Sequence, residues 1–143
     1  MSLGVMVNVD VENLGQATDF YCNALGLRVG RHLGPTIVEL LGAAAPIFLI
    51  EAPAGSAASG ACPQARYYSR HWTPVHLDFT VSDLDAALAR AQRAGAQLEG
   101  SVSTAAWGKL ARMSDPFGNG FCLVQFLNRG YDEIATTRTG LAN

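Results

Sequence analysis

The sequence predicts an α+β fold made of two tandem βαβββ modules. The first observation is an internal repeat: segments that begin at Val5 and Val75 both run through an alternating stretch, a polar cap, an amphipathic helix and a glycine. Aligning Asn13 with Asp83 gives an offset of 70 residues, which is too long for a solenoid unit and indicates a duplicated module. The second observation is that three short apolar runs, separated by turn residues, follow each helix.

The first strand of each module is expected from an alternation of apolar and polar side chains. In the first module Val5, Val7 and Val9 lie opposite Met6, Asn8 and Asp10; in the second, Leu77, Phe79 and Val81 lie opposite His76, Asp78 and Thr80. Because successive side chains of a strand point to opposite faces, each strand has an apolar face that a helix can cover. The polar face must meet water, a ligand cavity or a partner.

The helix of each module is expected from apolar residues at helical spacing. The two stripes comprise Leu14, Ala17, Tyr21, Ala24 and Leu25 in the first module, and Leu84, Ala87, Leu88 and Ala91 in the second. Ser82 or Asp83 is placed to cap the second helix, and Gly26 and Gly95 are placed to end the two helices. The remaining strands are expected at about 27–33, 36–41, 46–51, 97–103, 108–114 and 120–127.

These elements divide one structural domain into four segments. Residues 1–52 form the first module, 53–73 a linker or lid, 74–127 the second module and 128–143 a peripheral tail. The start of the linker is rich in Ala, Gly, Ser and Pro, which is typical of a mobile segment. The stretch RYYSRHWTP that follows combines aromatic and basic side chains, and we expect it to pack at the mouth of a cavity or against a second subunit.

Composition narrows the possible partners and location. A net charge of -2 and the lack of a basic stripe exclude nucleic-acid binding through phosphate neutralisation. The longest apolar stretch, LLGAAAPIFLIEA, is too short and too interrupted to span a bilayer, so no membrane partner is expected. Three cysteines without a CxxC spacing fit a reducing compartment, and we therefore expect a cytoplasmic protein.

A βαβββ module repeated twice and ending in DPFGNGFCLVQF resembles the vicinal-oxygen-chelate superfamily, the group of glyoxalase I, bleomycin-resistance and extradiol-dioxygenase proteins. The matching pieces are Phe20-Tyr21, Leu25-Gly26-Leu27, the strand end from His76 to Asp83, and the turn and strand from Asp115 to Phe126. The resemblance implies two curved sheets that form a cup, with helices outside and a ligand inside. It also implies that relatives with enzymatic activity hold a divalent metal in that cup, as a Lewis acid for substrate oxygens.

The resemblance places metal ligands on the first and last strands of each module, usually as His and Glu or Gln. Carried over residue by residue, the first-strand position of the second module falls on His76, which matches. The other three positions fall on Met6, Phe48 and Cys122. A shifted register would offer Glu51, but on the opposite sheet face. A lone imidazole does not hold a hard divalent ion against water, so the sequence predicts no metal or other cofactor; the alternative is a divalent metal held by rearranged ligands.

The candidate ligand-binding residues follow from the same face of the strands. Polar anchors are expected from Asn8, His76 and Asp78, and the walls and lid from Met6, Phe48, Phe126, Cys122, Trp72 and Trp107. For His76 the alternative is a structural histidine bonded to a neighbour. For Cys122 the pattern favours a small inert apolar residue over a nucleophile or a metal ligand.

Three functions remain open at this point, one of which is a structural or regulatory dimer that binds no ligand. The sequence favours a bleomycin-resistance-like protein that binds a small, partly apolar molecule without a complete metal site. The alternative is a metal-dependent lyase, isomerase or dioxygenase of the same superfamily, so catalysis is left undecided. A homodimer is expected, because open sheet edges and rim aromatics such as Tyr67, Tyr68 and Trp72 are surfaces that association covers.

Overall fold

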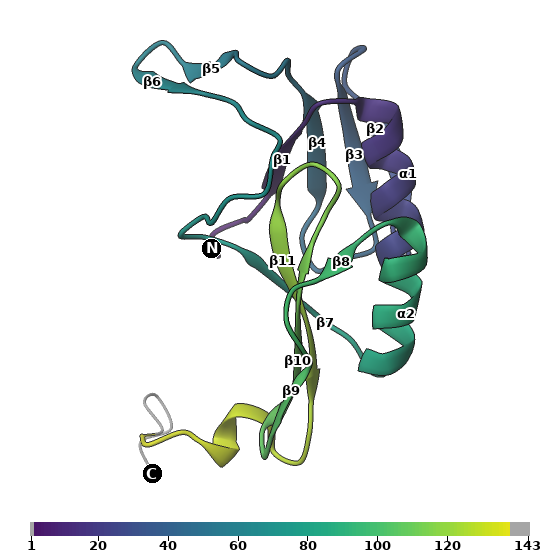
Figure 1. The fold of residues 1–143 in the computed structure, drawn as a ribbon, viewed down its shortest axis with the longest axis vertical. Helices are drawn as coiled ribbons and strands as arrows, with labels where there is room; N and C mark the ends of the chain where they lie inside the picture. Colours follow the sequence, from purple (N-terminus) through teal and green to yellow (C-terminus); the bar gives the residue numbers. More distant parts are fainter. Residues whose placement is uncertain (1, 138–143) are drawn as a thin grey trace.

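Two sheets with the same strand order form the framework of the protein, in a computed structural model that describes residues 2–137 (Figure 1). The first module contains β1 (Val7–Val11), α1 (Leu14–Leu25), β2 (Arg28–His32), β3 (Ile37–Leu41) and β4 (Ile47–Glu51), in the sheet order β1-β4-β3-β2. The second contains β7 (Leu77–Thr80), α2 (Leu84–Ala94), β8 (Gln97–Leu98), β10 (Gly108–Ser114) and β11 (Gly120–Phe126), in the order β7-β11-β10-β8. The predicted α+β fold of two βαβββ modules is confirmed.

The strand registers show which residues of the two modules are equivalent. In each module the first strand pairs in parallel with the last, and the last pairs antiparallel with the strand before it. Asn8 pairs with Phe48, and Asp78 pairs with Cys122. Phe48 and Cys122 therefore occupy equivalent positions, as the repeat predicts.

Both helices begin and end in the same way. Asn13 and Asp83 are the N-caps and accept hydrogen bonds from Gln16 N and Ala86 N, while Gly26 and Gly95 end the helices with left-handed φ angles of 70° and 114°. A residue of the last strand adds a second bond at each N-terminus. Glu51 Oε2 accepts from Leu14 N at 2.8 Å, and Gln125 Oε1 accepts from Leu84 N at 2.8 Å. Glu51 is therefore a structural residue on the helix-covered face.

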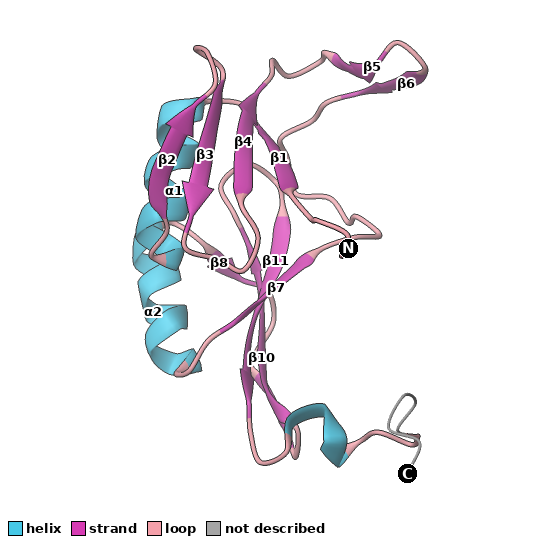
Figure 2. Ribbon diagram, turned by 180° about the vertical axis from the view of Figure 1, so that it is seen from behind, coloured by secondary structure: helices cyan, strands magenta, loops and turns pink. Residues whose placement is uncertain are grey.

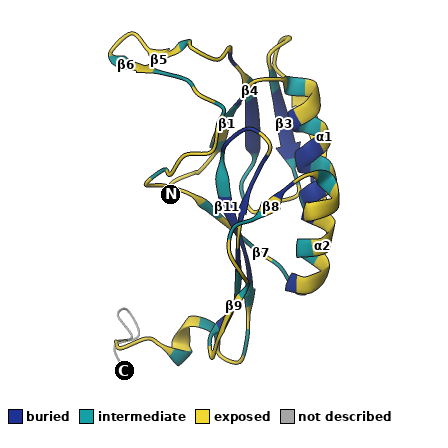
Figure 3. Cartoon of the chain, viewed as in Figure 1, coloured by how far each residue is buried: buried dark blue, intermediate teal, exposed yellow. Residues whose placement is uncertain are grey.

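The two helices lie along the same side of the molecule, with the sheets on the other (Figures 1 and 2). Their inward faces are buried and their outward faces exposed (Figure 3). One hydrophobic core joins the modules: the fully buried side chains come from both and include Val11, Leu40, Leu49, Leu84, Met113 and Leu123. The modules therefore share a core and do not form separate domains.

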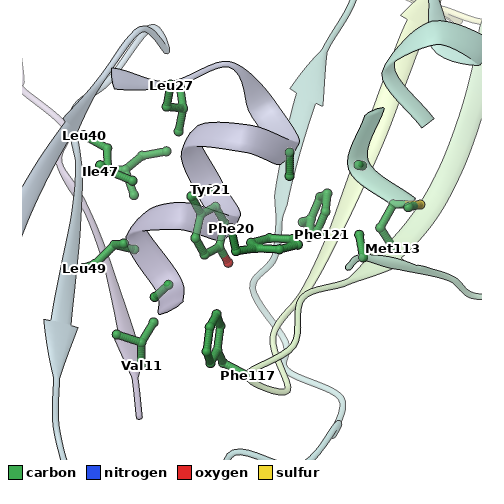
Figure 4. Close-up of a cluster of buried hydrophobic side chains, with 14 of the residues drawn as sticks. Val11, Phe20, Tyr21, Leu27, Leu40, Ile47, Leu49, Met113, Phe117 and Phe121 are labelled. Carbon is green, nitrogen blue, oxygen red and sulfur yellow. The ribbon is translucent and has the colours of Figure 1, made fainter. Parts of the chain in front are cut away.

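The turn between β10 and β11 carries a buried hydrogen bond that links the two modules. Phe117 inserts into the core and meets the ring of Phe20 edge-on, with centroids 6.4 Å apart (Figure 4). Asp115 Oδ1 accepts from the backbone N–H groups of Phe117 and Asn119, both at 2.8 Å. Asp115 Oδ2 accepts from the Tyr21 hydroxyl of α1 and from Asn119 Nδ2. A buried carboxylate of the second module thus holds the helix of the first.

Several elements differ from the sequence-based expectation. The first strand begins at Val7 rather than Val5, and the single strand expected at 97–103 is divided into β8 and β9 (Ser103–Ala105), of which β9 pairs with the far end of β10. A chain that turns through Gly100 cannot keep one straight register along β10. In the tail, Gly130–Glu133 forms a 3-10 helix, and residues 138–143 lie outside the described part of the chain.

The segment expected as a linker contains a two-stranded hairpin, β5 (Ala57–Ser59) and β6 (Cys62–Ala65), which projects from the body of the molecule (Figure 1). Composition alone did not predict it, because its strands carry few branched side chains. Arg66 ties the base of this hairpin to the first module: Nε binds Asp10 Oδ2 at 2.7 Å, and Nη1 donates to Ala57 O at 2.7 Å. No helix among residues 2–137 is long and apolar enough to span a membrane.

Candidate functional site

The first strands of the two modules, β1 and β7, border a cleft of about 410 Å³. We call it the inter-module cleft. Its polar lining includes Asn8, Asp10, His76 and Asn119; its apolar lining comprises Val7, Val9, Val75, Leu77, Phe79 and Phe121, with Tyr21 from α1. The structure therefore brings two of the predicted anchors, Asn8 and His76, into one cavity. A largely apolar cleft with a few convergent polar groups is the usual form of a small-molecule site.

A smaller pocket of about 130 Å³ is also lined by His76. We call it the cysteine pocket, because Cys122 lines it. It shares four lining residues with the inter-module cleft: Thr73, His76, Gly120 and Phe121. Trp72, a predicted lid residue, also lines this pocket and is 78% exposed. The two cavities are thus neighbours that share His76 in their lining.

One wall of the cysteine pocket is an ion pair. Arg70 binds Glu99 through two bonds, Nε to Oε2 at 2.6 Å and Nη2 to Oε1 at 3.0 Å. The hydrogen bonds from Arg70 hold the pKa of Glu99 below its ordinary value. The guanidinium lies against Gly120, where a methyl group would come within 2.5 Å of Nη2. Gly120 therefore leaves the room that this ion pair occupies.

Three side chains with metal-binding atoms form a cluster that includes His76, the histidine that lines both cavities. His76 Nε2 lies 3.1 Å from Asp78 Oδ1, and the ligand atoms of His76, Asp78 and Cys122 all lie within 4.8 Å of one another. Burial, followed by the nearby charge of Asp78, raises the pKa of Cys122 to about 11. The thiol is therefore protonated at neutral pH, which is the behaviour of a small buried residue rather than of an activated nucleophile.

A family model described as a glyoxalase-like domain matches residues 6–124, which include both modules and the segment between them. The chain belongs to this glyoxalase-like family. Its fold is that of the vicinal-oxygen-chelate superfamily, so the resemblance stated from the sequence is confirmed.

One curated protein and two solved structures are similar to this glyoxalase-like chain. The anthracycline biosynthesis protein DnrV of Streptomyces peucetius is 32% identical over 131 residues, covering 90% of this chain and 43% of that protein. The chain thus spans less than half the length of this curated relative. The structure of TnmS3, an antibiotic-binding protein from Streptomyces sp. CB03234, matches with a TM-score of 0.62 and 25% identity, covering 89% of this chain and 98% of that one. The fosfomycin resistance protein FosX of Listeria monocytogenes matches in fold, with a TM-score of 0.71, 15% identity and coverage of 94% and 99%.

The donor atoms of this glyoxalase-like chain do not fit a hard divalent ion. Mg²⁺ and Mn²⁺ favour sites rich in oxygen, whereas the cluster offers one carboxylate, one imidazole and one thiol. The same three groups are a partial donor set for Zn²⁺, which takes four ligands in structural sites and three plus water in catalytic ones. A metal there would also have to displace the thiol proton.

The other predicted site residues lie elsewhere. Phe48 is buried on the equivalent face of the first module, and Met6 precedes β1 with 66% of its surface exposed. Trp107 and Phe126 form an aromatic cluster with Tyr131, with centroids 4.8 to 6.2 Å apart. None of these four predicted residues is among the described residues that line the inter-module cleft or the cysteine pocket. Asp78 lines neither cavity but contacts two residues that do, His76 and Cys122, and it lines a separate groove of about 580 Å³.

Three charged residues of the cysteine pocket were not singled out from the sequence: Arg70, Glu99 and Arg112. The position of Arg112 next to Cys122 could have been predicted from the sequence. The predicted strands 108–114 and 120–127 flank a five-residue turn, and an antiparallel pairing across it places Arg112 opposite Cys122, as observed. The contact between Arg70 and Glu99 could not have been predicted in this way, because the two residues lie in separate loops that only the tertiary fold brings together.

Proposed function

We propose that the protein binds a small, flat and partly apolar molecule in the inter-module cleft and the cysteine pocket, without a complete metal site. The observation that carries this proposal is the pair of neighbouring cavities that share His76 in their lining. Their lining combines apolar and aromatic surface with a few polar groups, which suits binding with a fixed orientation.

The comparisons support a ligand of the antibiotic class. One relative is named for anthracycline biosynthesis and a structural neighbour for antibiotic binding. Flat polycyclic compounds are complementary to clefts lined by aromatic and branched side chains. An anthracycline is therefore the first compound to test.

The test is a titration with doxorubicin, followed by its own fluorescence and by quenching of the tryptophan fluorescence of the protein. We expect saturable binding, weakened about tenfold to a hundredfold in His76→Ala, because loss of a polar anchor costs about 1–3 kcal/mol. Asp78→Ala should weaken binding as well, since Asp78 orients the imidazole at 3.1 Å. Arg93→Ala is the matched control, because Arg93 is exposed on α2. Equal affinities for all four proteins would contradict the proposed site.

A metal-dependent lyase, isomerase or dioxygenase is the second candidate, and the cluster of His76, Asp78 and Cys122 is the observation that favours it. The proposal of a metal-free site predicts far less than one divalent metal per chain after purification without chelator. Elemental analysis checks this. About one zinc per chain that disappears in His76→Ala would favour the metal-dependent enzyme.

We also propose that the protein is a cytoplasmic homodimer. Large apolar side chains such as Tyr67, Trp72 and Val75 are 70 to 81% exposed, which is surface that a second copy would cover. Its three cysteines are free, which suits a reducing compartment. Light scattering at micromolar concentration tests the assembly, and a particle with the mass of one chain would contradict it.

A further inference from the structure

Arg112 is the unpaired charge of the cysteine pocket. Arg70 and Glu99 neutralise each other there, and His76 is bonded to Asp78. Arg112 lines the same pocket, yet no hydrogen bond or ion pair joins its guanidinium to another residue within 2–137. Arg112 is exposed on β10, so its guanidinium is open to a ligand in the pocket.

The acids nearest to Arg112 are engaged by other residues. Glu99 N donates to the carbonyl oxygen of Arg112, but the Glu99 carboxylate is bound by Arg70. Arg112 pairs with Cys122 on β11, and Cys122 pairs with Asp78 on β7, so the three side chains lie in one row on the same face. Two strand spacings of about 4.8 Å separate Arg112 from Asp78. The carboxylate of Asp78 is bonded to His76, the residue before β7, and to the thiol of Cys122. The middle residue of the row, Cys122, carries a neutral thiol and so forms no ion pair with the Arg112 guanidinium.

The equivalent position in the first module shows the contrasting case. Glu39 pairs with Phe48 as Arg112 pairs with Cys122, so Glu39 and Arg112 are equivalent. Glu39 is buried and fully engaged by Arg31, with Nε 2.9 Å from Oε1 and Nη2 2.7 Å from Oε2. In the first module the charge at this position, Glu39, is bound by another side chain of the protein. In the second module the equivalent charge, Arg112, is not.

We propose that Arg112 binds an oxyanion of the ligand, a carboxylate or an ionised phenol, and so selects acidic flat molecules over neutral ones. This rests on the proposed function of the two cavities. The planar guanidinium matches such groups with paired N–H donors. The cysteine pocket, at about 130 Å³, holds one ring or one acidic head group, while the inter-module cleft, at about 410 Å³, takes the apolar body across His76.

Three probes with one ring system separate charge from shape: anthraquinone-2-carboxylate, 2-hydroxyanthraquinone at a pH where the phenol is ionised, and anthraquinone-2-carboxamide. Binding is measured by calorimetry or tryptophan quenching with the parent protein, Arg112→Gln and Arg93→Gln. The two substitutions remove the same charge, but Arg93 is exposed on α2 and lines neither cavity.

We expect the parent protein and Arg93→Gln to bind at least one anionic probe about tenfold more tightly than the carboxamide. In Arg112→Gln this preference should fall to about onefold, with the affinity for the carboxamide unchanged. Preference for one of the two anions identifies which oxyanion the pocket takes. Equal binding of all three probes to the parent protein, or a preference that persists in Arg112→Gln, would overturn the role of Arg112 and leave the proposed function standing. Failure of all three probes to bind would overturn both.

Discussion

The two modules share one scaffold but differ on the sheet face turned away from the helices. Across equivalent strands, the first module presents Asn8, Phe48 and Glu39, and the second presents Asp78, Cys122 and Arg112. In the first set Phe48 is buried and Glu39 is bound by Arg31, whereas Asn8 is exposed and lines the inter-module cleft. The second set lies around the cysteine pocket, where Cys122 and Arg112 form part of the lining.

The two modules have the same arrangement at the ends of their helices. Each helix has an acid or amide at its N-cap, a glycine in the left-handed region at its end, and a carboxylate or amide from the last strand bonded to its first N–H. These bonds satisfy backbone groups that any such module must satisfy. The sheet face is free of that requirement, so its side-chain chemistry can differ between the two halves of a duplicated fold.

The turns between the last two strands differ in the same manner. Gly42–Pro46 and Asp115–Asn119 have the same length, yet only the second carries a buried acid and an aromatic side chain. Phe117 fills the space against α1, whereas the equivalent residue, Ala44, lines a groove of about 580 Å³ that also touches α2 at Arg90. The second turn therefore holds the modules together, and the first leaves a hollow.

The largest expected effect comes from removing the acid of the second turn. Asp115→Ala leaves the Tyr21 hydroxyl and the N–H groups of Phe117 and Asn119 without their acceptor. Each buried donor left unpaired costs about 1–3 kcal/mol, so we expect a loss of about 3–5 kcal/mol in the free energy of unfolding. Urea denaturation measures it. Asp19→Ala, on the exposed face of α1, should change stability by less than about 0.5 kcal/mol; similar losses for both variants would contradict the role of the turn.

Tyr21 should make stability depend on alkaline pH. Burial, and then Asp115, raise the pKa of Tyr21 well above its ordinary value, so the folded protein keeps the phenol neutral. The unfolded chain releases this proton above about pH 10, so the stabilisation is complete below that pH and is lost as the pH rises, by up to about 1.4 kcal/mol per pH unit. Tyr21→Phe should be less stable at neutral pH by about 1–2 kcal/mol. Its stability should also fall less steeply from pH 10 to 11 in urea titrations; parallel pH profiles would rule this out.

The shared helix bonds predict equal losses in the two modules. Glu51→Ala and Gln125→Ala each remove one acceptor from a helix N-terminus, and each should cost about 1 kcal/mol. Thermal or urea unfolding of the two variants measures both costs on the same protein. A measurable loss in only one of them would show that the modules are not equivalent at this position.

The smallest effect concerns the hollow beside the first turn. Ala44→Phe places an aromatic side chain at the position equivalent to Phe117, next to a groove with room for it. We expect a gain of about 0.5 kcal/mol from apolar burial, measured as a higher unfolding temperature. Ala58→Phe, on the exposed hairpin, is the control. A destabilisation at position 44 alone would show that the groove is not the counterpart of the space that Phe117 fills.

Much of the fold and part of the site could be predicted from local patterns. Strand parity was sufficient to place His76 beside Asp78 and to make Phe48 equivalent to Cys122, because the side-chain period of a strand is fixed. Parity does not tell which face positions line a cavity. Phe126 and Trp107 were expected at the ligand site but contact Tyr131, since the chain after β11 folds back on them. That contact depends on the path of the tail, which no local pattern predicts.

The bond between Tyr21 and Asp115 also has a consequence for how the chain folds. It joins residues 94 positions apart, so most of the chain must be ordered before it can form. Loss of either partner should then speed unfolding and leave the folding rate nearly unchanged, as for a contact absent from the transition state. The native lifetime of the protein depends in this way on a contact that neither module can make alone.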